Sequence, residues 1–130
     1  MKSLTNKAKT IFCDIDGTIL QHAGEMENLI SVLGNPRHEL NPKLLPGVKE
    51  RFQEWEEKGY NIILTTGRRE SLRVSTEQQL FVLGISYDQL IMGIGGGQRV
   101  LINDLKPNNT ESTAIAICLE RNKGMEDIKI

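Results

Sequence analysis

Apolar and polar positions along the chain follow two alternating patterns, and each pattern predicts a different kind of element. Short apolar runs bounded by turn residues are typical of buried strands. The clearest run, Ile11-Phe12-Cys13, is followed closely by the turn residues Asp16-Gly17. Strands are predicted at residues 9–15, 60–65, 90–92 and 100–102, with a further edge strand at 127–130.

Longer segments between these runs have the spacing of amphipathic helices. Val48, Phe52 and Trp55 recur at helical intervals within residues 46–58, and Gly59 follows as a stop signal. Further helices are predicted at residues 70–83, with a core stripe of Leu72, Thr76, Leu80 and Leu83, and at residues 113–121. Strands that alternate with helices are joined by right-handed crossovers, so the pattern predicts an α/β fold: a Rossmann-like parallel sheet with helices on both faces.

One long segment does not fit this alternation. Residues 20–44 separate the first strand from the first helix and contain Gly24, Gly34 and Pro36. A loop of this length is uncommon in a compact domain unless it has a role, such as covering a site. We interpret residues 20–44 as a flap or small-cap insertion, helical around residues 26–33, within a single domain that spans residues 1–130.

Composition and charge narrow the kinds of partner. A chain of 130 residues has the usual size of one domain, and its formal net charge of -1 provides no broad basic face. This disfavours nucleic acid and favours a small molecule. Cys13 and Cys118 lie far apart in a chain with no secretion-signal pattern, so we expect a reducing, cytoplasmic setting. No apolar stretch approaches the roughly 20 residues that cross a bilayer, and a homo-oligomer stays open.

Polar clusters follow three of the predicted strands. Asp14 to Thr18 come after the first strand, residues 65–68 after the second, and Asn103-Asp104 after the run at 100–102. Ligands of open parallel sheets bind beyond the carboxyl ends of the strands. We therefore expect these clusters to form one site.

The order of these clusters resembles the haloacid dehalogenase superfamily of phosphohydrolases. The first motif of that family, Asp-x-Asp-Gly-Thr, is present as Asp14 to Thr18, and a Thr before Gly-Arg and a later acidic residue follow in order. The resemblance implies that Asp14 is the nucleophile, Asp16 the general acid and base, and Thr66 a ligand of phosphate oxygens. It also implies that Asp104 binds magnesium.

Physical chemistry agrees with these roles. A carboxylate needs positive charge around it to attack an anionic phosphate, and Mg²⁺ prefers carboxylates, carbonyls, phosphate oxygens and water. Asp14, Asp104 and the main-chain carbonyl of Asp16 are the expected metal ligands. The expected substrate-binding residues are Gly17, Thr18, Gly67 and Arg68.

The resemblance has one gap. The family's lysine motif is missing, because no lysine lies between Lys58 and Asp104. Lys106 and Arg99 are the two candidate replacements, and the closeness of Lys106 to Asp104 in sequence favours Lys106 as the catalytic cation. Asn103 stands where many relatives have a first aspartate, which predicts weaker magnesium binding.

The predicted function is a magnesium-dependent phosphatase that hydrolyses a small phosphorylated metabolite, preferably a sugar or sugar-acid phosphate, through an aspartyl-phosphate. An alternative is a nucleotide or polynucleotide-end phosphatase, because residues 66–71 resemble that group. Two readings of another class stay open: a phosphoacceptor signalling domain and a catalytically silent binding protein.

Overall fold

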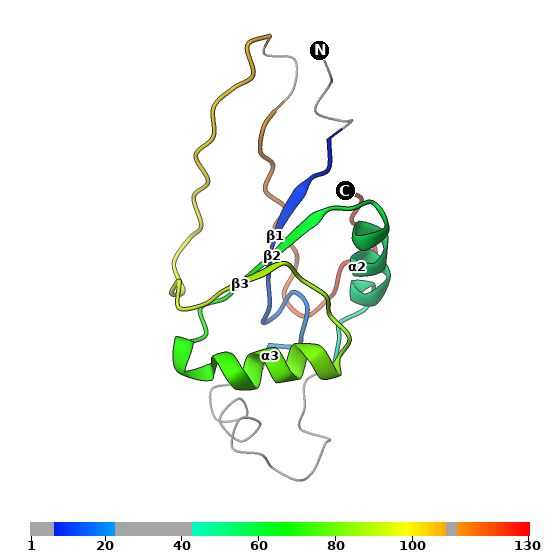
Figure 1. Cartoon of the computed structure of the whole chain (residues 1–130), viewed down its shortest axis with the longest axis vertical. Helices are drawn as coiled ribbons and strands as arrows, with labels where there is room; N and C mark the ends of the chain where they lie inside the picture. Colours follow the sequence, from blue (N-terminus) through cyan, green and yellow to red (C-terminus); the bar gives the residue numbers. More distant parts are fainter. Residues whose placement is uncertain (1–6, 23–42, 109–111) are drawn as a thin grey trace.

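A computed structural model describes residues 7–22, 43–108 and 112–130, and its centre is a three-stranded parallel sheet (Figure 1). The strands are β1 (Thr10–Asp14), β2 (Asn61–Thr65) and β3 (Gln89–Ile91), in the spatial order β1-β2-β3. The strands predicted at 9–15, 60–65 and 90–92 are thus confirmed. Asp14 pairs in register with Thr65, and Thr65 with Ile91, so the carboxyl ends of all three strands meet at one edge.

Two crossover connections carry the helices. Helix α2 (Val48–Glu57) joins β1 to β2, and a 3₁₀ turn, η3 (Glu70–Leu72), continues into α3 (Arg73–Val82) before β3. Both helices were predicted, and the residues of their predicted stripes lie in the core or pack against it. None of the helices among the described residues is long and apolar enough to cross a membrane.

The core lies on one face of the sheet. Alternate strand residues point to that face, and both helices bury their apolar side chains in the same cluster. The strand residues of the cluster are Ile11, Cys13, Ile62, Leu64 and Leu90.

The opposite face carries Phe12, Ile63 and Ile91, and Phe12 is 55% exposed. The prediction of helices on both faces is therefore wrong for the part of the chain that the structure describes. Its second face lacks a helix because the last predicted helix does not form.

Three predicted elements near the C-terminus are absent. Residues 100–102, 113–121 and 127–130 form neither strand nor helix, although their sequence patterns are suitable. Val100 is 77% exposed and Ile102 is 88% exposed, so no packing supports a strand there. Short segments rarely hold secondary structure in water without tertiary contacts.

The two ends of the segment predicted as a flap, Leu20 and Leu44, lie side by side. Leu20 and Leu44 form an isolated antiparallel bridge, and the Leu45 amide donates to the Ile19 carbonyl at 2.9 Å. Leu20 is fully buried, so this junction is part of the core. Residues 23–42 lie outside the described part, and the flap interpretation stays a prediction.

Candidate active site at the carboxyl edge of the sheet

Asp14 ends β1 at the carboxyl edge of the sheet, where its carboxylate contacts the following loop. The Thr18 hydroxyl donates to Asp14 Oδ2 at 3.3 Å. Partial removal from water raises the pKa of the Asp14 carboxyl, and the negative charge of Asp16 adds to this; the Ile15 amide and the Thr18 hydroxyl act in the opposite direction. Burial raises the pKa of the neighbouring Cys13 thiol to about 12, so this thiol stays protonated at neutral pH.

Asp16 is held by Arg68, from the loop after β2. Arg68 Nε donates to Asp16 Oδ2 at 2.9 Å, and its Nη2 donates to Asp16 Oδ1 at 2.7 Å. The remaining nitrogen, Nη1, donates to the Thr76 hydroxyl and to Gln79 Oε1 on α3. The bidentate pair fixes the carboxylate of Asp16, and α3 fixes the guanidinium.

This geometry changes the role of Arg68. The sequence predicted a substrate-binding residue, but the structure directs the guanidinium to Asp16. Sequence reasoning missed Thr76 and Gln79 as parts of the site. The available signal was Thr76 itself, a polar residue within an otherwise apolar helical stripe.

Thr66 and Gly67 line the edge beside Asp14, because Asp14 and Thr65 are register partners. The Thr66 side chain is buried, and its hydroxyl accepts a hydrogen bond from the Arg68 amide at 3.1 Å. A Cβ atom at Gly67 would lie 2.8 Å from the Gly95 carbonyl oxygen, so only glycine allows this approach.

Main-chain amides at the edge divide into two groups. The amides of Gly17 and Thr18, both predicted to bind substrate, already donate within their own loop, to Leu20 and Ile15. Within the described ranges, the amides of Asp16 and Gly67 have no acceptor. In this loop the Asp16 amide, and not the predicted Gly17 amide, is therefore the candidate donor to a phosphate oxygen.

Arg99 supplies positive charge at this edge. Its guanidinium donates to the carbonyls of Gly95 and Gly97, in the glycine-rich loop that follows β3. That loop is fastened to the site, because the Gly93 amide donates to Arg68 and the Ile94 amide to Thr66. The charge of Arg99 favours the ionised form of Asp14 and so partly offsets the rise in its pKa that burial causes.

Lys106, favoured from the sequence, lies seven residues further along a segment that leaves the sheet. The sequence argument placed Asp104 at the end of a strand at residues 100–102, with Lys106 close behind it, and that strand does not form. Arg99 is therefore the candidate that the described contacts hold next to this edge, through Gly95 and Gly97.

The preference for Arg99 over Lys106 as the candidate cation leads to a prediction. We expect Arg99→Gln to lower the rate of phosphate-ester hydrolysis by about 100-fold, the usual cost of removing a transition-state charge contact. In a reaction that uses the ionised Asp14 carboxylate as nucleophile, activity would fall as pH falls through the pKa of Asp14. Loss of Arg99 raises that pKa, which moves the acid limb of the pH–rate profile to higher pH.

Lys106→Gln is the matched control for this experiment. Like Arg99→Gln, it removes one positive charge, but it should leave the acid limb of the pH–rate profile in place. A profile that moves with Lys106→Gln and not with Arg99→Gln would return the role to Lys106.

Asp104 is not brought to Asp14 and Asp16. It lies exposed, where its carbonyl accepts a hydrogen bond from the Thr113 hydroxyl at 2.6 Å, and Asn103 donates to the Thr113 carbonyl at 3.3 Å. Among the described residues, no cluster of three or more Asp, Glu, His or Cys side chains is close enough to hold a metal ion. The predicted three-aspartate magnesium site is thus incomplete in this structure.

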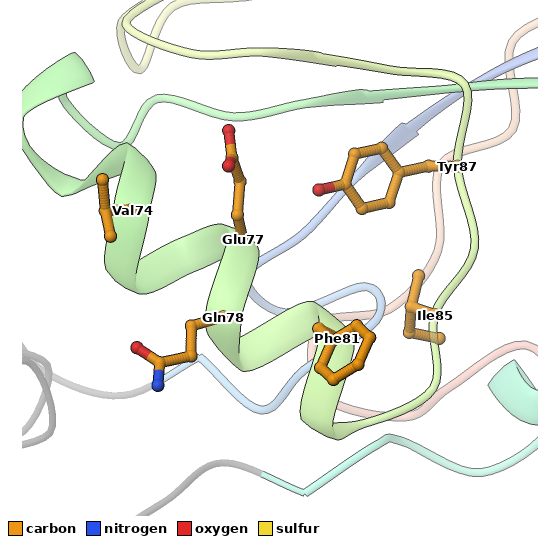
Figure 2. A pocket seen from close by; sticks show the side chains of 6 residues that line it. All are labelled: Val74, Glu77, Gln78, Phe81, Ile85 and Tyr87. Carbon is orange, nitrogen blue, oxygen red and sulfur yellow. The ribbon is translucent and has the colours of Figure 1, made fainter.

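A shallow pocket lies elsewhere, on the outer side of α3. Its lining consists of Val74, Glu77, Gln78, Phe81, Ile85 and Tyr87 (Figure 2). Loss of hydration and the charge of Glu77 raise the pKa of the Tyr87 hydroxyl, which therefore stays protonated at neutral pH. None of the predicted site residues lines this pocket, so it is separate from the strand-end site.

Comparison with known proteins gives one informative likeness. No protein-family model matches the chain, and no curated protein matches it. Among solved structures, a chain of the Pnkp1/Rnl/Hen1 complex is similar to it, with a TM-score of 0.54 and 28% sequence identity. The similarity covers 74% of this chain and 31% of that chain, so this chain corresponds to about a third of its neighbour.

Proposed function

We propose that the chain is a phosphoesterase of the haloacid dehalogenase type, which hydrolyses phosphate monoesters with Asp14 as the nucleophile. The main support is the arrangement at the carboxyl edge of the sheet. The Asp14 carboxylate lies there in the electrostatic field of Arg99. Asp16, two residues further along the same loop, is held by Arg68. A silent binding protein would not need an acid group fixed beside a nucleophile.

The reaction has two displacements. Asp14 Oδ attacks phosphorus and the bond between phosphorus and the ester oxygen breaks. Asp16 gives that oxygen a proton, for which one of its oxygens must be protonated and released from Arg68 when substrate binds. Water then attacks the phosphorus of the aspartyl-phosphate, Asp16 takes the proton of the water, and inorganic phosphate leaves with Asp14 restored. The Thr66 hydroxyl and the amides of Asp16 and Gly67 stabilise the phosphoryl oxygens, and Arg99 offsets their charge.

Mg²⁺ is the proposed cofactor. The Asp14 carboxylate and the Asp16 main-chain carbonyl would hold it, and substrate oxygens and water would complete the shell, since Mg²⁺ often takes only one or two carboxylates. When bound, it supplies charge neutralisation for the phosphoryl group.

A metal titration tests this ligand set. We expect chelation to abolish hydrolysis and added Mg²⁺ to restore it, with Ca²⁺ a poor substitute because its coordination shell is larger and looser. Asp104→Asn should leave the half-saturating Mg²⁺ concentration within about twofold, because among the described residues Asp104 forms no metal-holding cluster with Asp14 and Asp16. An increase of tenfold or more would show that Asp104 reaches the metal.

The likeness to a chain of the Pnkp1/Rnl/Hen1 complex bears on the substrate. It favours the nucleotide or polynucleotide-end alternative over the sugar phosphate that the sequence analysis ranked first, and the resemblance of residues 66–71 points in the same direction. A net charge of -1 favours a short substrate, whose binding depends on few phosphate contacts. We therefore propose a terminal phosphate on a nucleotide or short oligonucleotide as the substrate.

A substrate panel tests the proposal. It contains oligonucleotides phosphorylated at the 5′ or the 3′ end, nucleoside monophosphates and sugar phosphates, each assayed with Mg²⁺ by phosphate release. We expect the highest kcat/KM with a nucleotide-end phosphate and no release by Asp14→Asn. Preference for sugar phosphates would overturn the substrate class, and no turnover of any member would support a silent relative.

A further inference from the structure

The segment between β3 and the C-terminal residues projects from the fold as an extended arm, which we define as residues 100–108 and 112–118. Figure 1 shows its first limb, yellow to orange, running along the molecule, and its second limb, orange, returning to the body. No main-chain hydrogen bond joins the described residues 96–107 or 112–119 to another part of the described chain. The limbs touch near the tip, where Asn103 and Asp104 bond to Thr113.

The arm presents apolar side chains to water. Ile102 is 88% exposed, which is unusual for a side chain that gains so much from burial. The exposed apolar side chains of the arm are Val100, Leu101, Ile102, Leu105, Ile115 and Ile117. An extended apolar segment with unpaired main-chain groups is a template for pairing with another chain.

The body has a matching uncovered surface, namely the sheet face of Phe12, Ile63 and Ile91 together with the outer edge of β1. Within the described residues, β1 pairs only with β2, and no helix covers this face. Parallel sheets in soluble proteins are normally covered on both faces, because their strands are apolar on both sides. The structure therefore has two exposed apolar surfaces, and its own arm does not cover its own sheet.

We propose that the chain forms a two-fold dimer in which the arm of each copy packs on the open sheet face and β1 edge of the other. Each copy has one arm and one open face. A single two-fold axis therefore lets each arm cover the face of the other copy, and no surface is left to bind a third copy. The anchors of the arm stay in place: Ile94 bonds to Thr66 before it, and Asn122 bonds to Gly17 after it.

The size and charge of the surfaces are suitable. Burial of a side chain such as isoleucine removes on the order of 100 Å² of apolar surface from water. Two arms on two sheet faces then bury an area within the roughly 1,200–2,000 Å² of stable interfaces. A net charge of -1 per copy gives little repulsion between copies.

Light scattering during size-exclusion chromatography of the full chain, over a dilution series, tests the proposal. We expect twice the chain mass of 14.6 kDa. Ile102→Asp on the arm and Phe12→Asp on the sheet face should each raise the dissociation constant at least tenfold. Ile102 is the decisive position, because an almost fully exposed side chain contributes little to the fold of one copy; circular dichroism checks that each variant is folded.

Phe81→Asp on α3 is the matched control, since Phe81 is 84% exposed and lies outside the arm. It should leave the dimer intact. A parent protein that is monomeric, an assembly of another size, or a folded Ile102→Asp variant with unchanged dissociation overturns the proposal. Dissociation by Phe81→Asp alone would assign the interface to α3 instead. The proposal does not depend on the phosphatase activity, and none of these outcomes requires turnover.

Discussion

Asp14→Asn is expected to reduce the turnover of phosphate esters by at least about 1,000-fold, because the amide keeps the shape of the side chain and loses the nucleophile. The same change should not harm the fold. Partial burial raises the pKa of the Asp14 carboxyl, so its charge opposes folding at pH values above that pKa. We therefore expect a thermal midpoint at neutral pH that is equal to or above that of the parent.

Two measurements check this prediction, namely phosphate release and thermal unfolding followed by circular dichroism. Asp88→Ala is a useful contrast, because Asp88 accepts a hydrogen bond from the Ile62 amide at 2.8 Å and alanine has no side-chain acceptor. It should lower the midpoint and leave turnover in the remaining folded protein near the parent value. Parent-like turnover by Asp14→Asn would remove Asp14 from the mechanism.

Arg68→Ala is expected to have the second largest effect, and it should act on both rate and stability. The side chains of Arg68 and Asp16 are only 13% and 19% exposed. Removal of the Arg68 side chain therefore leaves the Asp16 carboxylate partly buried without its partner. Breaking a fully buried ion pair costs about 3–5 kcal/mol, and residual access of water reduces this to roughly 2 kcal/mol here. The rate should fall by about 100-fold, because Asp16 loses its fixed position as the proton donor.

Arg69→Ala is the matched control, as Arg69 is the exposed neighbour of Arg68. It should change neither property measurably. Arg68→Lys distinguishes positioning from charge, because lysine keeps the charge and loses the bidentate geometry. A fall in kcat with KM nearly unchanged indicates positioning of Asp16, whereas a rise in KM alone would indicate the substrate contact that the sequence predicted.

Local sequence patterns were sufficient for the elements that bury a clear apolar face. Strands β1, β2 and β3 and helices α2 and α3 each combine such a face with a turn or stop residue, and each forms near its predicted position. The strand-end position of Asp14, Asp16 and Thr66 follows from this alternation, because parallel strands end at one edge.

Patterns failed in the last third of the chain. The run at 100–102 and the helical spacing at 113–121 are suitable for a strand and a helix, but both segments are exposed and extended. Short elements depend on a surface to pack against, and sequence periodicity does not say whether that surface is available. The assignments of Lys106 and Asp104 depended on this strand, and the structure brings neither residue to Asp14.

The sequence by itself determined the order of the elements, the parallel sheet and the motif at the end of β1, because the apolar spacing and turn residues of each element are local patterns and the parallel pairing follows from their alternation. Only the tertiary structure decided which groups act on the two aspartates. Arg68 lies 52 residues from Asp16 and bonds to it, and the glycine-rich loop that holds Arg99 bonds to Arg68 and Thr66. These contacts depend on how three loops meet at one edge, which local patterns do not contain.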